Sequence, residues 1–371
     1  MIIGVDARVL VHQPTGVARY LRGLLGAYPP LRGENERLRL YVDRPPTERL
    51  PGPADAWEQI AWRPPGGDPA WRQLRLAAHV RRHPPEVLFC PFYSIPLAAR
   101  CPSVVTIHDV SFLAHPEWFR WRSRLAFSLV GPSARRASKV LTVSRFSATE
   151  IVERLGVPAA RIEIIPPGID EQWGRPIREG EWDGLFRWLE HTGAYLLHLG
   201  AVHERRNPFL LLESFARVCP DHEDLALVIA GPTMQPSPDL DAAIDELGLS
   251  GRVRRRQWVP EPLLRPLIAG ARALAYLSSY EGFGLPALEA MSVGTPVIAL
   301  RCASLPEVLG DAAVWVENPT LDEVSAAFRE LLDSDAAVET LRQRGLERAA
   351  QFRWERAARA TFEVLREVAG R

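Results

Sequence analysis

One ten-residue stretch, Tyr280–Glu289 (YEGFGLPALE), limits what this chain can fold into more than any other. It lies between two apolar runs, Arg272–Leu277 and Thr295–Leu300, which are typical of buried parallel strands. Pro286 suits the first position of a helix, where its missing N–H costs nothing. Gly294 suits the helix end, because glycine accepts the left-handed conformation. The stretch therefore predicts a strand, a glycine loop, a short helix and a second strand.

The same stretch has the features of an anion-binding site. Gly282 and Gly284 allow the main chain to approach a ligand closely, and the N–H groups near Leu285 point out of the helix start. Two carboxylates flank these amides: Glu281 in the loop, and Glu289 one turn into the helix. A diphosphate bound to the amides would have one carboxylate near each end. The alternative is an ordinary helix start with two solvated glutamates.

The string Glu-Gly-Phe-Gly-Leu-Pro-x-Leu-Glu, with seven residues between its glutamates, resembles the signature of retaining glycosyltransferases of the GT-B fold, family four. The resemblance spans almost the full chain, from Asp6 to Arg371. It implies an α/β protein with two Rossmann-like domains whose parallel sheets face each other across a central cleft. It also implies that Glu289 holds the donor's ribose hydroxyls and that Glu281 lies near the transferred sugar. The residues it implies at the donor diphosphate are Gly282, Phe283, Gly284 and Leu285.

The first half of the chain carries two further parts of the resemblance. A helix is expected to open at Gly16, with Thr15 as its N-cap, and the family's N-terminal glycine loop faces the donor diphosphate. The apolar strand Val104–Ile107 runs directly into His108 and Asp109. Groups just past the carboxyl ends of strands line the crevice of an open α/β sheet. The resemblance implies that this pair positions the acceptor or the sugar; the alternative is a structural His-Asp pair.

Paired arginines supply the positive charge that a diphosphate requires. Arg205 and Arg206 follow the apolar strand Tyr195–Leu199 and directly precede a helix start at Asn207. Guanidinium groups bind phosphate oxygens bidentately, so the pair can neutralise a diphosphate. The family typically has Arg-Lys-Asn here, so phosphate geometry can differ. The resemblance seats the nucleotide base beside two further strand ends, at Gly231 and Val259.

The 371 residues are enough for two domains with substantial cores. The resemblance and the order of expected elements predict an acceptor-binding domain, a tryptophan-containing connector, a nucleotide-sugar-binding domain and a terminal helix that crosses back to the first domain. The expected boundaries of these four segments are 1–170, 171–192, 193–352 and 353–371.

The net charge of zero hides an uneven distribution. Residues 1–168 hold 23 Lys and Arg against 14 Asp and Glu, which gives +9, and the remainder holds 22 against 31, which gives −9. The basic half predicts either an anionic acceptor or membrane surface, or simply complementary domain faces. The stretch Trp118–Leu125 interleaves aromatics with arginines and fits a peripheral membrane contact, an acceptor surface or an inward-packed helix.

Several classes of protein are disfavoured. No apolar run approaches the length of a membrane span, and the first residues resemble a strand more than a signal peptide. Four cysteines without metal spacing fit a reducing compartment. We therefore expect a cytoplasmic protein, with peripheral attachment to the inner face of the membrane as a further option. A phosphorylase would need a lysine for pyridoxal phosphate, and Lys139 is the only lysine in the sequence.

The expected activity is transfer of a hexosyl group from a nucleoside diphosphate sugar to a glycan or lipid-linked acceptor, with retention of configuration. We recognise no Asp-x-Asp metal motif, so we expect no metal and no cofactor, with the arginines and loop amides meeting the leaving-group charge. No nucleic-acid partner is expected. Similarity to bacterial mannosyl- and rhamnosyltransferases of polysaccharide assembly favours GDP-mannose as the donor. A non-catalytic nucleotide-sugar-binding subunit and a nucleotide-sugar epimerase of similar fold are the alternatives.

Overall fold

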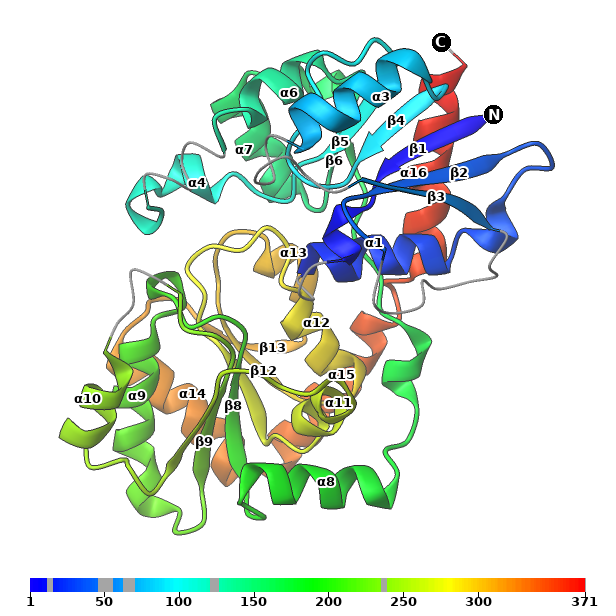
Figure 1. The fold of residues 1–371 in the computed structure, drawn as a ribbon. Coiled ribbons are helices and arrows are strands. Elements are labelled where there is room, and N and C mark those ends of the chain that lie inside the picture. The colour runs from blue at the N-terminus through cyan, green and yellow to red at the C-terminus, as the bar shows by residue number, and fades with distance from the viewer. Residues whose placement is uncertain (12–15, 46–55, 63–70, 121–126, 235–238, 371) are drawn as a thin grey trace. The chain divides into compact units, whose positions relative to one another are not determined.

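The computed structural model describes residues 1–11, 16–45, 56–62, 71–120, 127–234 and 239–370. The chain divides into two compact units (Figure 1). Unit 1 comprises Met1–Asp170 together with Phe352–Arg371, and unit 2 comprises Glu171–Gln351. Each unit is an α/β structure built on one parallel sheet, which confirms the expected fold class.

The sheet of unit 1 has the strand order β3-β2-β1-β4-β5-β6-β7, and all neighbouring strands are parallel. Strands β4, β5 and β6 are buried along their whole length, which fits the aliphatic and β-branched residues at their centres. The strands are β1 (Ile2–Asp6), β2 (Arg37–Val42), β3 (Trp57–Ala61), β4 (Val87–Cys90), β5 (Ser103–Thr106), β6 (Lys139–Thr142) and β7 (Ile162–Ile164).

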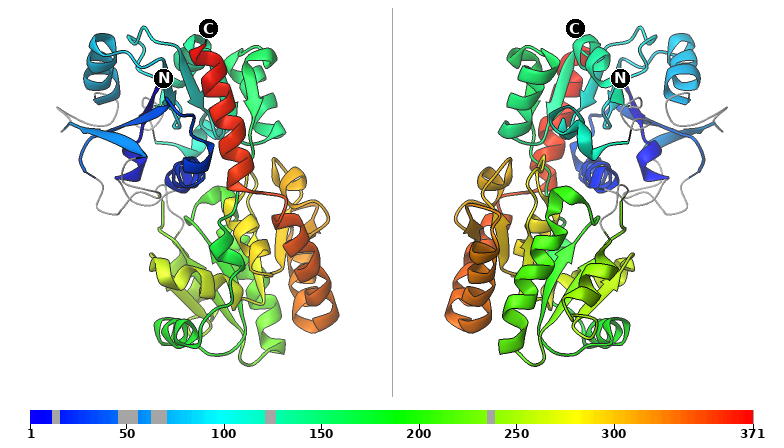
Figure 2. Two further views of the ribbon diagram at one scale, coloured as in Figure 1. Left: turned by 90° about the vertical axis from the view of Figure 1, so that its right-hand side faces the viewer. Right: turned by 90° about the vertical axis from the view of Figure 1, so that its left-hand side faces the viewer.

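Helices cover both faces of this sheet. One face carries the hydrophobic core formed with α3, α6 and α7. Helix α16, the last of the chain, contacts β4, β5 and β6 and packs against α1 (Figure 2). The helices are α1 (Gly16–Gly26), α3 (Ala77–Arg82, preceded by a π-helical turn at Trp71–Leu76), α4 (Ser111–Ala114), α6 (Val130–Arg136), α7 (Arg145–Leu155) and α16 (Trp354–Ala369).

Two contacts fix α16 to unit 1. The Trp354 ring occupies the space beside Gly23 of α1, where a Cβ atom would lie 2.1 Å from the ring. At the other end of the helix, Arg366 forms a bidentate ion pair with Glu36, at 2.8 and 3.0 Å. The apolar stripe along this helix therefore has its partner within unit 1.

The sheet of unit 2 has the order β10-β9-β8-β11-β12-β13, again with every neighbouring pair parallel. Its four central strands are fully buried, as their apolar sequences require. The strands are β8 (Tyr195–Leu199), β9 (Ala226–Ala230), β10 (Val253–Arg256), β11 (Ala273–Tyr276), β12 (Val297–Leu300) and β13 (Ala313–Val316).

A hydrophobic core of unit 2 lies between this sheet and α9, α10 and α14. Elsewhere in the unit α11 packs against α8, and α12 packs against α15. The helices are α8 (Glu179–Leu189), α9 (Pro208–Val218), α10 (Leu240–Glu246), α11 (Glu261–Ala269), α12 (Leu285–Ser292), α13 (Leu305–Leu309), α14 (Leu321–Asp333) and α15 (Asp335–Ala349). Helix α8 lies within residues 171–192, the segment expected to connect the domains.

One expected strand is shorter than the sequence pattern indicated. The alternation over Arg252–Val259 predicts a strand of that length, but β10 ends at Arg256. It is the edge strand of the sheet, and its last main-chain bond is the one from Gly231 N to Arg256 O, at 2.8 Å. The residues that follow lead into the proline that caps α11, so they make no further ladder.

The stretch expected as a surface or inward-packed helix, Trp118–Leu125, is only partly within the described residues, because 121–126 lie outside them. Trp118 is buried and stacks on His115, with ring centroids 3.9 Å apart. Thr15, the expected N-cap of α1, also lies outside the described residues. Among the helices that the structure describes, none combines the length and apolar character needed to cross a bilayer.

Candidate functional site

The candidate site of unit 2 lies where the strand order of its sheet reverses. Strand β8 pairs with β9 on one side and with β11 on the other, so the chain leaves β8 and β11 in opposite directions across the sheet. Ligands of open α/β sheets bind at this kind of switch point, at the carboxyl ends of the strands. Here β8 leads to Gly200 and the arginine pair, and β11 leads to the glutamate–glycine loop.

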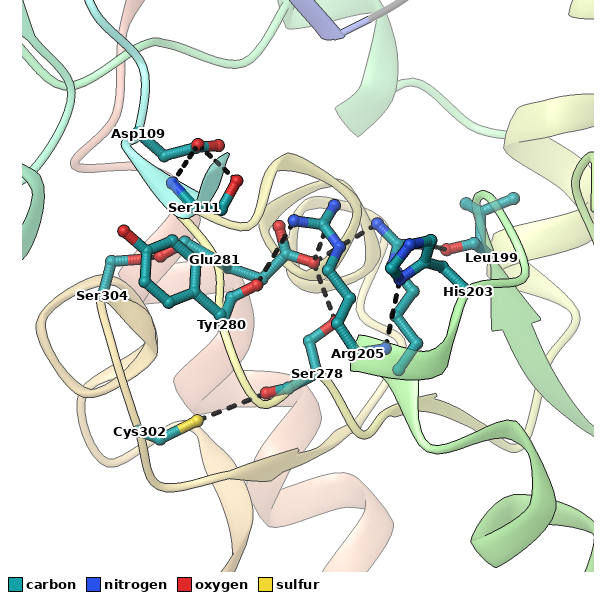
Figure 3. Close-up of polar contacts among 11 residues, drawn as sticks. Asp109, Ser111, Leu199, His203, Arg205, Ser278, Tyr280, Glu281, Cys302 and Ser304 are labelled. Atoms are coloured by element: carbon teal, nitrogen blue, oxygen red, sulfur yellow. Dashed lines mark hydrogen bonds and ion pairs between the residues drawn. The ribbon is translucent and has the colours of Figure 1, made fainter. Parts of the chain in front are cut away.

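The structure brings both arginines to Glu281, which follows Arg206 by 75 positions in the sequence. Figure 3 shows Arg205 beside Glu281. Arg206 Nη2 donates to Glu281 Oε1 at 3.3 Å, and Arg205 Nη2 lies 3.8 Å from the same oxygen. Arg206 Nη1 also donates to the carbonyl of Leu199 at 3.0 Å. The Arg206 side chain is 8% exposed and that of Arg205 is 24% exposed. Arg206 is therefore held by two protein groups, and Arg205 is the more exposed of the two arginines.

Two glycines make room for this arrangement. Gly200 has φ 112°, and a Cβ atom there would lie 2.0 Å from Arg206 Nη1. Gly231, at the end of β9, has φ 148°, and its Cβ would lie 2.1 Å from the Gly200 carbonyl oxygen. Both positions require glycine for the backbone conformation and for close packing. Gly231, expected at the nucleotide base, thus has a packing role beside the arginine site as well.

Polar side chains hold the arginine turn against the end of β11. His203 Nδ1 accepts a hydrogen bond from Arg205 N at 3.2 Å and caps the short 3-10 helix at 204–206. Asn207, in the left-handed conformation at φ 49°, donates from Nδ2 to Leu277 O at 2.8 Å and to Ser279 Oγ at 2.9 Å. The arginine turn and the glutamate loop therefore form one connected structure.

Glu281 is a buried carboxylate with several donors. Burial by itself raises the pKa of Glu281, but the guanidinium groups of Arg205 and Arg206 outweigh it and hold the pKa below its usual range. Ser278 Oγ donates to Glu281 Oε1 at 2.8 Å, and Ser304 Oγ donates to the main-chain carbonyl of Glu281 at 2.8 Å. The carboxylate therefore stays ionised at neutral pH.

Two buried neighbours of this cluster, His198 and Tyr276, are uncharged at neutral pH. Burial, assisted by the charge of Arg206, lowers the pKa of His198 to about 3, so this histidine is neutral. The Tyr276 ring lies 5.5 Å from the Arg206 guanidinium carbon. Burial and the nearby Glu281 carboxylate raise the pKa of Tyr276, so its hydroxyl stays protonated. The charged groups of the cluster are then two cations and one anion, which leaves a net positive site.

Helix α12 starts next to this cluster, at Leu285, and Pro286 occupies its first turn. Gly284 adopts the left-handed conformation at φ 101°, where a larger residue would be strained and would lie 2.9 Å from the Leu305 side chain. Phe283 is buried. Glu289, four residues after Leu285, is 3% exposed on the same helix. The glycine-loop residues and Glu289 thus share one loop and one helix with Glu281.

In unit 1, His108 lies past the end of β5 and contacts the residue that follows β4. His108 Nε2 is 2.9 Å from the Pro91 carbonyl, which can only accept, so Nε2 carries the hydrogen. Burial lowers the pKa of His108, so the ring is neutral and Nδ1 is an acceptor. Its ring packs edge-on against Tyr20 at 5.0 Å, and its carbonyl accepts from Ser147 Oγ at 3.0 Å. The imidazole is therefore held in one orientation.

The neighbouring carboxylate, Asp109, forms local hydrogen bonds. Asp109 Oδ1 accepts from Ser111 N at 3.0 Å and from Ser111 Oγ at 2.8 Å, which starts the short helix α4 (Figure 3). Gly16 is the exposed first residue of α1, and Val259 is a half-buried residue between β10 and α11. Gly16, His108 and Asp109 belong to unit 1, whereas the other expected site residues belong to unit 2.

The sequence reasoning missed four polar residues of the unit 2 site. A signal was present, because all four follow the carboxyl end of a switch-point strand or of its neighbour β12, where small polar side chains contact the loops. They are His203, Asn207, Ser278 and Ser304.

Comparison with known proteins agrees with this architecture. Residues 187–349 match the family described as "Glycosyl transferases group 1", and residues 14–173 match "Glycosyltransferase Family 4". Sucrose-phosphate synthase from Thermosynechococcus elongatus superposes with a TM-score of 0.78 at 18% identity, covering 100% of this chain and 99% of that one. HepE of Anabaena, in complex with UDP and glucose, superposes with a TM-score of 0.77 at 20% identity, covering 98% and 99%. These likenesses show the GT-B fold.

Two curated relatives are closer in sequence. O-antigen chain mannosyltransferase B of Escherichia coli is 32% identical over 71% of this chain and 69% of its own length. The MMP alpha-(1->4)-mannosyltransferase of Mycolicibacterium hassiacum is 32% identical over 64% of this chain and 56% of its own length. The fold, the matched families and these relatives define a glycosyltransferase of the GT-B class. The chain belongs to the group 1 glycosyltransferases, family 4.

Proposed function

We propose that this glycosyltransferase moves a hexosyl group, by preference mannosyl, from a nucleoside diphosphate sugar to a glycan or lipid-linked saccharide, with retention of configuration. The observation that carries the proposal is the positively charged cluster of Arg205, Arg206 and Glu281 beside the start of α12, at the switch point of the sheet. The names of the two curated mannosyltransferases support mannose as the sugar.

The chemistry follows from where charge develops. As the bond between sugar and diphosphate breaks, negative charge grows on the diphosphate and positive charge grows on the sugar. Arg205, Arg206 and the amides of residues 282–285 stabilise the negative charge on the diphosphate. The Glu281 carboxylate stabilises the positive charge on the sugar. The leaving phosphate accepts the proton of the acceptor hydroxyl, so no side-chain base is needed. His108 Nδ1 accepts a hydrogen bond from a sugar or acceptor hydroxyl, and Asp109 shapes the loop that follows.

The donor is identified by a thermal-shift panel of nucleoside diphosphate sugars. A ligand that binds the folded state raises the unfolding temperature by mass action. GDP-mannose should give the largest shift, and UDP-glucose is the essential comparison because HepE was crystallised with it. Trp258, 53% exposed and adjacent to Val259, offers an aromatic surface to a base at this strand end. A larger shift with a UDP-sugar would replace GDP-mannose as the proposed donor.

Glu289→Gln should mainly raise the donor KM. We assign Glu289 to the ribose hydroxyls, which are bound equally in the ground state and the transition state. Losing such an interaction raises KM and leaves kcat nearly intact. The expected rise is about tenfold, the effect of one good hydrogen bond to a charged group. Steady-state kinetics measure it, and a loss confined to kcat would contradict the ribose assignment.

Transfer should persist in excess EDTA, because the arginine pair already supplies charge for the leaving group. Two Asp-x-Asp strings do occur in the chain, a point the sequence reasoning overlooked, but they make other contacts. Asp239 caps α10 and Asp241 pairs with Arg255. Asp335 pairs with Arg272 at 2.7 Å, and Asp333 lies 3.4 Å from a histidine. A loss of about a hundredfold that manganese restores would disprove metal independence.

A further inference from the structure

Two buried serines bond to Glu281, one to its carboxylate and the other to its main chain. Ser278 Oγ donates to the carboxylate oxygen Oε1 at 2.8 Å, and Ser304 Oγ donates to the main-chain carbonyl at 2.8 Å. Both serines are fully buried. Ser278 is itself anchored, because Cys302 Sγ donates to its carbonyl at 3.3 Å (Figure 3). The hydroxyl of Ser278 is therefore a fixed donor at the base of the glutamate loop.

The oxygen that Ser278 binds is shared with both arginines. Glu281 Oε1 is 3.3 Å from Arg206 Nη2 and 3.8 Å from Arg205 Nη2. A diphosphate carries more negative charge than one carboxylate and forms bidentate bonds with guanidinium groups. Binding of the donor would therefore draw the arginines toward the phosphates and weaken their bonds to Glu281. Ser278 is neutral and buried, so the diphosphate does not attract its hydroxyl as strongly as it attracts the two guanidinium groups.

We propose that Ser278 is a positioning residue for glycosyl transfer: its hydroxyl keeps Glu281 Oε1 in place when the donor's diphosphate engages Arg205 and Arg206. This inference rests on the proposed function, in which the carboxylate stabilises charge on the transferring sugar. A carboxylate held in this way reaches the transition state without reorganising, which is where such electrostatic groups have most effect. Ser278 acts through Glu281 and makes no contact with the diphosphate itself.

The test compares Ser278→Ala with a matched control, Ser325→Ala. Ser325 is also buried in unit 2, and its hydroxyl makes no hydrogen bond within the described part of the chain. Ser278→Ala should lower kcat about tenfold while the Kd for the nucleoside diphosphate, measured by calorimetry, stays within about twofold. Ser278→Cys, a weaker donor of similar size, should fall between alanine and wild type. The control should change neither quantity.

A double-mutant cycle separates positioning from general structural damage. If Ser278 acts through the carboxylate, Ser278→Ala should cost less than about twofold in the Glu281→Ala background. A wild-type kcat in Ser278→Ala, or the same tenfold loss in both backgrounds, would overturn the inference. A Ser278→Cys rate below that of alanine would also overturn it. A wild-type kcat in Glu281→Ala alone would instead disprove the proposed function.

Discussion

Glu281→Gln should lower kcat by about a hundredfold or more at saturating donor. The carboxylate is ionised and buried beside two arginines, and it lies next to the glycine loop assigned to the donor. Positive charge develops on the sugar in the transition state more than in the ground state, so loss of the negative charge reduces kcat rather than binding. Steady-state kinetics with the identified donor measure the effect.

The structure adds a second expectation for the same variant. Glu281 contacts both arginines proposed to bind the diphosphate and would compete with it for them, so neutralising Glu281 should not weaken nucleoside diphosphate binding. Glu181→Gln is the matched control, since Glu181 also pairs with an arginine of unit 2, Arg265, at 3.1 Å. The control should leave kcat unchanged. A Glu281→Gln enzyme that turns over at the wild-type rate would refute the assigned role of this carboxylate.

Arg206→Ala should weaken nucleoside diphosphate binding by roughly 1.5–3 kcal/mol, the scale of a hydrogen bond between charged groups. Arg206 provides a cation at the switch point, and Gly200 and the Leu199 carbonyl hold it there. Arg206→Lys should recover part of the loss, because an ammonium keeps the charge but not the planar fork. Calorimetric titration with the nucleoside diphosphate gives the affinities.

A control arginine separates local binding from a general loss of charge. Arg272 pairs with Asp335 and bonds to the Leu331 carbonyl, next to the amino end of β11. Arg272→Ala should therefore leave nucleoside diphosphate affinity unchanged. Equal affinities of the wild type and Arg206→Ala for both the nucleoside diphosphate and the intact donor would exclude Arg206 from the diphosphate site.

Strand bounds were predicted best where a single apolar run lies between turn residues. Tyr195–Leu199 was predicted with the bounds that the structure shows, because fully buried parallel strands are continuous apolar runs. The helix at Pro286 was predicted one residue late, since Leu285 opens it. The family was recognised from the glutamate–glycine string, and the comparisons confirm it.

Contacts between distant segments could not be predicted from the sequence. Nothing in the local pattern shows that Glu281 would lie on Arg206, because that contact depends on β8 and β11 being neighbours in the sheet. The positions of Ser278 and Ser304 after strand ends were visible in the sequence, but their bonds to Glu281 depend on how the strands and loops pack. Asp109 was expected at the site from its position after a strand, and the structure adds that its Oδ1 bonds to Ser111, a contact that periodicity does not reveal.

The most direct test follows the anomeric configuration of the product by NMR. The enzyme is incubated in EDTA with the nucleoside diphosphate α-sugar selected by thermal shift and with a panel of saccharide and lipid-linked acceptors. We predict release of nucleoside diphosphate and an α-linked product, both abolished or greatly slowed in Glu281→Gln. A β-linked product, an epimerised donor, or calorimetric donor binding without turnover on any acceptor would contradict it.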